Sequence, residues 1–201
     1  MSSLSDLLKT KGKNLRPVST RVTLPSGRII HEQDGVEVDC GQSFGFVVDT
    51  KPDLQVGQVE ESLFLASQDV ANDVNLITQY GITHVLNVSG VPSQKLQGLD
   101  YLDVPILDLP EELLSCHFPQ CFAFIDKALK HGRVLVHCNA GISRSSSIVV
   151  AYLMNRRRLG LSETLKLIKT ARPKAQPNEG FMKQLQMYES SLIENDSHYV
   201  K

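Results

Sequence analysis

Short apolar runs alternate with longer segments of helical periodicity through most of the chain. The apolar runs predict strands at residues 62–66, 84–88, 101–107 and 133–137. Apolar positions spaced three and four residues apart predict helices at 69–80, 116–130, 161–171 and 178–192. Three serines followed by the apolar run 148–154 predict a further, buried helix at 144–158. Strands that alternate with helices are typical of a parallel sheet covered on both faces. We therefore predict an α/β fold with a mainly parallel central sheet of about five strands flanked by helices.

Residues 1–53 lack this alternation. Within them, residues 20–30 favour a β-hairpin with a Pro-Ser-Gly turn at residues 25–27. We expect an N-terminal extension over residues 1–53, partly mobile, a main domain over residues 54–193 and a polar tail over residues 194–201.

Charge is nearly balanced overall, with 21 Lys and Arg against 22 Asp and Glu, but it is unevenly spread. Residues 144–174 contain eight basic residues and one acid. This stretch is either a solvated helix face or a surface that steers acidic substrates. Its basic run at residues 156–158 is short and has no interleaved aromatic residues, so we expect no nucleic-acid partner.

The apolar runs and the cysteines indicate the cellular compartment and the cofactors that we expect. No apolar run approaches 18 residues and no signal-peptide pattern is present, so we expect no membrane partner and a cytoplasmic or nuclear protein with reduced thiols. The four cysteines show no metal-binding spacing, so we expect no metal or cofactor. Cys116 and Cys121 fall in a predicted helix, where packing is the simpler role and that of a resolving thiol the alternative.

Residues 137–144 carry the chemistry, because they combine His, Cys, five residues and Arg. A shuffled chain of this composition would contain that spacing roughly 0.005 times. The strand predicted at residues 133–137 precedes this segment and the helix predicted at residues 144–158 follows it. Backbone N–H groups at a helix start favour an anion, and Gly141 permits a tight turn. We therefore predict a phosphate-binding loop made of Asn139, Ala140, Gly141, Ile142 and Ser143.

The residues around this loop suggest a division of roles. Cys138 is the candidate nucleophile, since nearby N–H groups and a cation favour the thiolate. Arg144 offers a planar fork for two phosphate oxygens and for the charge of a transition state. His137 is expected to orient the loop and tune Cys138 rather than to act as a base.

A thiolate attack also needs an acid that protonates the leaving group. Asp108 is the candidate, because it follows the apolar residues 104–107 that we assign to the end of a strand, where sites gather in open α/β sheets. Asp100 and Asp103 come too early in that strand. Glu111 and Glu112 are alternatives on the same loop.

The loop sequence resembles the signature of the cysteine-dependent protein tyrosine phosphatases, and the chain is similar to their dual-specificity branch, among its atypical members. The similarity covers about residues 54–190. It rests on the loop, on Arg144 followed by Ser145, on Arg172-Pro173, on Pro177-Asn178-Glu179-Gly180-Phe181 and on residues 82–88.

The resemblance implies a protein tyrosine phosphatase-like fold and further residue roles. It also selects Asp108 as the general acid and base. It implies that Ser145 donates a hydrogen bond to the departing thiolate of Cys138. Asn178 is implied as a support of the loop from behind, with a turn residue after Pro177 as the alternative.

The substrate follows less directly. The loop carries no Lys between Cys138 and Arg144, whereas phosphoinositide-directed relatives tend to carry lysines there, so phosphoproteins are the expected partners. No counterpart of the tyrosine-recognition loop is evident, which favours dual specificity. The resemblance points to kinases of the stress-activated (JNK) MAP kinase pathway. A scaffold role in such a cascade, or a phosphatase acting on lipid or RNA 5′ phosphate, remains the alternative, and the oligomeric state stays open.

Overall fold

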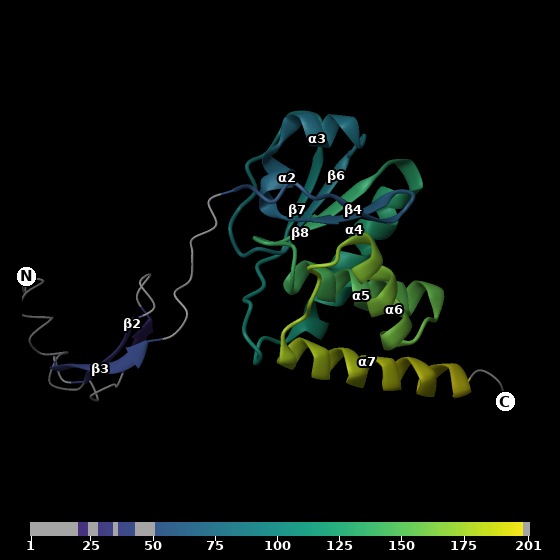
Figure 1. Cartoon of the computed structure of the whole chain (residues 1–201). Coiled ribbons are helices and arrows are strands. Elements are labelled where there is room, and N and C mark those ends of the chain that lie inside the picture. The colour runs from purple at the N-terminus through teal and green to yellow at the C-terminus, as the bar shows by residue number, and fades with distance from the viewer. Residues whose placement is uncertain (1–19, 24–27, 34–35, 43–50, 199–201) are drawn as a thin grey trace, which may run out of the picture. The chain divides into compact units, whose positions relative to one another are not determined.

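The computed structural model describes residues 20–23, 28–33, 36–42 and 51–198, and the chain divides into two compact units, Met1–Lys51 and Pro52–Lys201 (Figure 1). In the first unit, β1 (Thr20–Thr23), β2 (Arg28–Gln33) and β3 (Val36–Gln42) form an antiparallel sheet in that order. The β1–β2 pairing agrees with the predicted hairpin, whose turn at residues 25–27 lies outside the described residues. Strand β3 was not predicted.

The second unit is built on a five-stranded sheet with the order β4-β5-β8-β6-β7. Its strands are β4 (Gly57–Glu60), β5 (Leu63–Ala66), β6 (His84–Asn87), β7 (Asp100–Asp103) and β8 (Val134–His137). Only β4 is antiparallel to its neighbour, and the other pairs are parallel. The predicted α/β fold with a mainly parallel sheet of about five strands is therefore confirmed.

Helices cover both faces of this sheet (Figure 1). They are α2 (Gln68–Asn72), α3 (Val74–Gln79), α4 (Phe118–His131), α5 (Arg144–Arg157), α6 (Leu161–Ala171) and α7 (Glu179–His198), with a 3₁₀ turn, η1 (Leu114–His117), before α4. None of the helices that the structure describes is long and apolar enough to cross a membrane. The helices predicted at 116–130, 144–158 and 161–171 match α4, α5 and α6 closely, while α7 continues beyond its predicted end at 192.

Alternate residues of the central strands enter two separate cores. Leu63 and Leu65 of β5 belong to the larger core, which α4, α5, α6 and α7 cover. Phe64 and Ala66 belong to the smaller core under α2 and α3. Successive side chains of a strand point to opposite faces, so a strand that is apolar at every position must be covered on both sides.

The helix predicted at residues 69–80 is wrong, because Asp73 divides it into α2 and α3. Asp73 has an extended backbone, with φ −89° and ψ 102°. Its carboxylate accepts hydrogen bonds from the N–H groups of Asn75 and Leu76, at 2.9 and 3.1 Å, and so caps α3. Apolar periodicity continues across this break and hides it.

The strand predicted at residues 101–107 is also wrong at its end. Strand β7 stops at Asp103, and Val104 adds one backbone hydrogen bond to Asn87, at 2.8 Å. Pro105 has no N–H with which to continue the ladder. Residues 104–107 are therefore an apolar connection and not a strand, although Val104 and Ile106 are buried. Strand β4 was not predicted at all.

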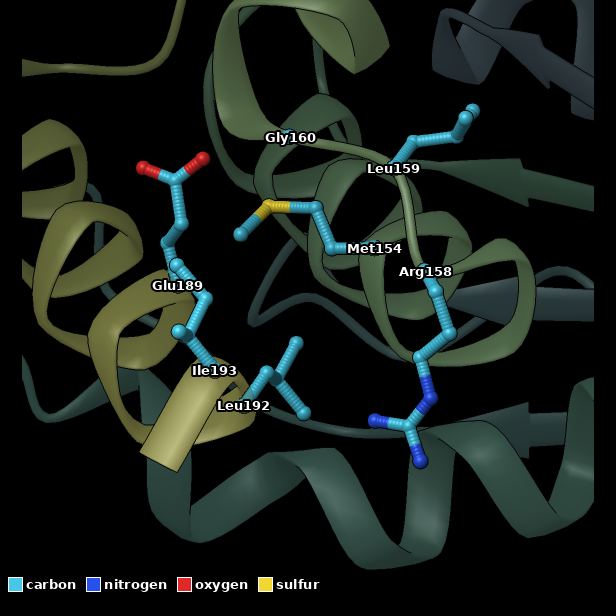
Figure 2. Close-up of a pocket in the computed structure, with 7 residues that line it drawn as sticks. All are labelled: Met154, Arg158, Leu159, Gly160, Glu189, Leu192 and Ile193. Carbon is cyan, nitrogen blue, oxygen red and sulfur yellow. The ribbon is translucent and has the colours of Figure 1, made fainter. Parts of the chain in front are cut away.

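Helix α7 closes over the C-terminal end of α5 and leaves a cavity of about 200 Å³ there (Figure 2). Figure 2 shows the Met154 side chain pointing into this space, with Leu192 and Ile193 of α7 beside it. Glu189 accepts a hydrogen bond from the N–H of Leu161 at 2.7 Å and so satisfies the start of α6. Met154 follows Arg144 by ten residues, about 15 Å along the helix, so this cavity is separate from the loop between β8 and α5.

Replacing Asp73 tests the break between α2 and α3. Asp73→Ala should lower the free energy of unfolding by about 1 kcal/mol, because the first turn of α3 loses its cap. Asp73→Asn is the matched control, since Asn caps helices as well as Asp does. Urea unfolding followed by circular dichroism measures both, and equal losses in the two variants would contradict a capping role.

Candidate active site

The loop of residues 138–143 leaves the middle of the parallel sheet. Strand β8 ends at His137, which pairs with Ala66 of β5 on one side and with Asn87 of β6 on the other. Helix α5 begins at Arg144, directly after the loop. The loop therefore lies at the carboxyl edge of the sheet, where sites in open α/β folds are found.

Arg172 supports the middle of this loop from behind. Its guanidinium donates to the carbonyls of Ala140 and Gly141, at 2.7 and 2.8 Å. It also donates to the carbonyl of Gln55 at 2.7 Å and pairs with the Asp53 carboxylate at 3.2 Å. The Arg172 side chain is fully buried, and these four acceptors are the compensation that a buried charge requires.

Two backbone donors hold the carbonyls on either side. The N–H of Gln68, at the start of α2, donates to the Asn139 carbonyl at 2.9 Å. The N–H of Gln176, between α6 and α7, donates to the Ile142 carbonyl at 2.7 Å. The four consecutive carbonyls of residues 139–142 are thus all bonded to the surrounding protein.

This arrangement fixes where the N–H groups of the loop point. In a trans peptide the C=O of one residue and the N–H of the next point in opposite directions. Four outward carbonyls at residues 139–142 therefore direct the N–H groups of residues 140–143 to the inner side of the loop. Successive N–H groups that converge in this way form a site for an anion.

Gly141 is required by the space around the loop as well as by its conformation. Its φ is +65°, a value that L side chains rarely adopt. A Cβ at this position would lie 2.3 Å from the carbonyl oxygen of Ala66. The loop can therefore approach β5 only with glycine here.

Cys138 lies at the start of the loop and is 2% exposed. The hydroxyl of Ser145, which is completely buried in the first turn of α5, donates to its sulfur at 3.2 Å. A hydroxyl in this position stabilises a thiolate. The contact that the resemblance implied between Ser145 and Cys138 is thus present in the structure.

His137 is buried beside Cys138, and burial lowers the pKa of its imidazole to about 4. Its Nδ1 lies 3.2 Å from the Cys138 carbonyl, which can only accept, so Nδ1 carries the proton. Its Nε2 is buried without a hydrogen-bond partner among the described residues. A neutral His137 can orient the backbone of Cys138, but it contributes no positive charge near neutral pH.

Arg144 lies across the carboxyl edge of the sheet with its side chain 11% exposed. Its Nη1 donates to the carbonyls of Ser89 and Ile106. Its Nε lies 3.5 Å from a carboxylate oxygen of Asp108, an ion pair whose geometry is too poor for a hydrogen bond. The two carbonyls fix the guanidinium, and its buried Nε has no hydrogen-bond partner among the described residues.

Asp108 is joined to the loop by two further side chains. Its Oδ1 accepts from the Ser143 hydroxyl at 2.7 Å and from the Asn178 side-chain amide at 2.9 Å. The backbone N–H of Asn178 donates to the same Ser143 hydroxyl at 3.1 Å. The carboxylate is 38% exposed and so remains open to a ligand above the loop. Asn178, predicted to support the loop, in fact contacts both Asp108 and Ser143.

Three of the other candidate acids have partners elsewhere in the fold. Asp100 pairs with Lys127 at 3.2 Å, and Asp103 accepts hydrogen bonds from Asn87 and Ser93. Glu112 pairs with His117 at 3.3 Å.

Among the candidate acids in the described part of the chain, Asp108 is the one that contacts Arg144. The sequence argument that Asp108 directly follows a strand was wrong. Strand β7 ends five residues earlier, at Asp103.

The sequence interpretation missed the role of Arg172. The Arg172-Pro173 pair was visible as a family element, but nothing local indicates that this arginine is buried or that it contacts residues 53–55. The alternative role for Cys121 as a reactive thiol is also weak, because burial raises its pKa to about 12. Cys121 belongs to the larger core, whereas Cys116 is exposed.

The chain is similar to known proteins over most of its length. The model of the dual specificity phosphatase catalytic domain matches residues 63–191. Dual specificity protein phosphatase 19 of Mus musculus is 42% identical over 200 residues, which cover 94% of this chain and 91% of that protein.

Solved structures of related proteins also superpose on this chain. Human DUSP28 superposes with a TM-score of 0.64 at 38% identity, covering 71% of this chain and 95% of that one. The human tyrosine phosphatase-like serine/threonine/tyrosine-interacting protein superposes with a TM-score of 0.65 at 32% identity, covering 69% and 98%.

Replacing Arg172 tests its support of the loop. Arg172→Met should lower the free energy of unfolding by about 3–5 kcal/mol, since three carbonyls lose their donor and Asp53 loses a partner. Lys174→Met is the matched control, because Lys174 also pairs with Asp53, at 3.0 Å, but is 58% exposed. Its loss should stay below about 1 kcal/mol. Similar losses in the two variants, measured by urea unfolding, would contradict the role of Arg172.

The buried neutral state of His137 predicts a pH dependence. Its pKa is about 4 in the folded protein and 6.5 in the unfolded chain, so the unfolded chain binds more protons between these values. The stability that His137 contributes is complete above pH 6.5 and falls by about 3 kcal/mol as the pH drops to 4.

NMR titration of the His137 ring, assigned with His137→Asn, should give a midpoint near pH 4. A midpoint near 6.5 would contradict burial of a neutral ring.

Proposed function

The chain belongs to the dual specificity phosphatase family and is a protein phosphatase, and we propose that it hydrolyses phosphotyrosine, phosphoserine and phosphothreonine through a cysteinyl-phosphate intermediate. The observation that carries this proposal is the convergence on one loop of a nucleophile, an acid and a cation. Cys138 contacts Ser145, and Asp108 is tied to the loop through Ser143 and contacts Arg144.

In the first step the phosphate of the substrate enters the loop and its phosphorus faces Cys138. The thiolate attacks phosphorus in line, and the P–O bond to the substrate breaks as the P–S bond forms. The N–H groups of residues 140–143 and the Arg144 guanidinium hold the three equatorial oxygens while charge moves through the transition state. Asp108 gives its proton to the departing oxygen, so the substrate leaves as an alcohol or phenol.

In the second step a water molecule attacks the same phosphorus. Asp108, now a carboxylate, takes a proton from this water, and the P–S bond breaks to release inorganic phosphate. The sulfur departs as a thiolate and receives the hydrogen bond of Ser145. Ser143 and Asn178 donate hydrogen bonds to Oδ1 of Asp108, and we assign proton transfer in both steps to Oδ2, the oxygen that lies 3.5 Å from Arg144 Nε.

The lining of the loop supports a phosphoprotein substrate. The residues between Cys138 and Arg144 are Asn139, Ala140, Gly141, Ile142 and Ser143, and none carries a charge that would meet a second phosphate of an inositol lipid. We propose phosphorylated proteins of a stress-activated MAP kinase pathway as substrates, in the cytoplasm or the nucleus. Phosphate release from phosphopeptides, phosphoinositides and triphosphate RNA tests this choice, and preference for either nonprotein substrate would overturn it.

A second role, as a scaffold that binds kinase-cascade proteins, is favoured by one observation. The first unit, Met1–Lys51, forms its own sheet, and the exposed Val36 and Val38 lie on its last strand. One structural relative is named a tyrosine phosphatase-like serine/threonine/tyrosine-interacting protein. Capture of cell proteins by Asp108→Ala, compared between the full chain and residues 52–201, separates the roles, because a scaffold would lose its partners with the first unit.

The cysteinyl-phosphate step makes a kinetic prediction for Ser145. Ser145→Ala should slow the second step about 10- to 100-fold, because the departing thiolate loses a charged hydrogen bond, so a burst of product precedes slow turnover. Ser147→Ala is the matched control, since its buried hydroxyl donates to the Ser143 carbonyl within α5. Stopped-flow measurement with an aryl phosphate resolves the burst.

Cys138→Ser completes this test. It should abolish turnover while phosphopeptide still binds. Turnover near that of the unmodified protein in this variant would contradict the mechanism.

A further inference from the structure

Two neighbouring cavities lie beside the phosphate loop. The nearer cavity, of about 400 Å³, is lined by Ile142 of the loop, Asn178 and Pro110. The farther cavity, of about 520 Å³, lies between α6 and α7. Both are lined by Gln176, Pro177 and Glu179, so the two cavities are neighbours along the segment between α6 and α7, and together they are called the groove.

The far part of this groove combines an apolar floor with basic walls. Leu165 of α6 and Met182 of α7 are half-buried and form the floor. Lys169 and Lys183 are exposed and line opposite helices. Neither lysine pairs with a carboxylate among the described residues, so both charges are available to a ligand.

The near part of the groove has a different character. Glu179 contributes a carboxylate where the two cavities meet, and at the first turn of α7 it is favoured by the helix dipole. An acidic side chain would be repelled at this point and attracted farther along, by the lysines. The groove therefore favours an acidic substrate residue only at the end farther from the loop.

Hydrogen bonds fix the position of the groove relative to the catalytic residues. The segment between α6 and α7 is bonded to Ile142 through the Gln176 N–H and to Asp108 through Asn178. Pro177, between these two anchors, is buried. A substrate chain whose phosphoresidue lies in the loop would pass directly over this segment. Three extended residues span about 10 Å, so residues near the phosphoresidue would lie in the groove.

We propose that this groove binds the substrate polypeptide beside its phosphoresidue, and that it selects an apolar side chain for Leu165 and Met182 followed by an acidic side chain for Lys169 and Lys183. This inference rests on the proposed function and deepens it, because it names the kind of phosphoprotein segment that the site prefers. The occupant is a stretch of substrate within about four residues of the phosphoresidue, about 13 Å when extended. Lys169 and Lys183 determine specificity and take no part in the chemistry.

Charge reversal of the two lysines tests the groove. Lys169→Glu and Lys183→Glu are combined in the full chain, and kcat/KM is measured for 4-nitrophenyl phosphate and for four phosphotyrosine peptides. Two peptides carry an apolar and an acidic residue three and four positions away, one pair before the phosphotyrosine and the other after it. The other two peptides carry Gly and Lys at the same positions.

The unmodified protein should hydrolyse one of the two apolar-acidic peptides about tenfold faster, in kcat/KM, than its Gly-Lys counterpart. In the double variant that preference should be lost or reversed, and kcat/KM for that peptide should fall about tenfold more than kcat/KM for 4-nitrophenyl phosphate. Raising the salt concentration should weaken the preference of the unmodified protein, since exposed charges are screened.

The combined Lys130→Glu and Lys166→Glu variant is the matched control. It changes net charge by the same amount at exposed lysines of α4 and α6 that do not line the groove, and it should keep the peptide preference. An unmodified protein that hydrolyses all four peptides equally, or a control variant that loses the preference as fully as the groove variant, would overturn the groove and leave the phosphatase function standing. Failure of the unmodified protein to hydrolyse any phosphopeptide would overturn the proposed function itself.

Discussion

The phosphate loop depends on the buried Arg172, which lies outside the loop and bonds two of its carbonyls. Its guanidinium takes up the carbonyls of Ala140 and Gly141, and the opposite ends of those two peptide groups are the N–H donors of the anion site. The same side chain reaches Gln55 and Asp53, so the segment before β4 and the loop after β8 share one buried charge. A planar donor with several N–H groups suits this position, because a lysine could not satisfy separate acceptors in the same plane.

The acid and the loop are coupled by a second set of contacts. The hydroxyl of Ser143 and the amide of Asn178 both donate to one oxygen of Asp108. These hydrogen bonds connect the acid, the loop and the residue before α7. Close packing at Gly180 reinforces this, since a Cβ there would lie 2.0 Å from the Pro110 carbonyl oxygen. The groove between α6 and α7 uses the same segment as its wall. Catalysis and the proposed selection of substrate sequence therefore both depend on the segment between α6 and α7.

The sequence predicted most elements and failed where local signals compete. Apolar periodicity predicted α4 and α6, because the burial of one helix face determines the spacing of apolar residues. Helix α5 was predicted from its apolar run at residues 148–154 instead, and Ser145 to Met154 are all buried. The same periodicity continued across Asp73 and hid the break between α2 and α3. It also extended β7 through residues 104–107, where burial without strand pairing gives an identical pattern. Periodicity reports burial, and it does not report which backbone groups are hydrogen-bonded.

The sequence by itself determined the part of the site that is local. Cys138, Gly141 and Arg144 fall within seven residues, and the geometry of one tight turn between a strand and a helix dictates their types. The tertiary structure decided which distant groups complete that turn. Arg172 lies 31 residues from Gly141 and 119 from Asp53, and Asn178 lies 70 from Asp108. Such contacts depend on how whole elements pack and on which polar groups that packing buries, and neither is encoded in the spacing of neighbouring residues.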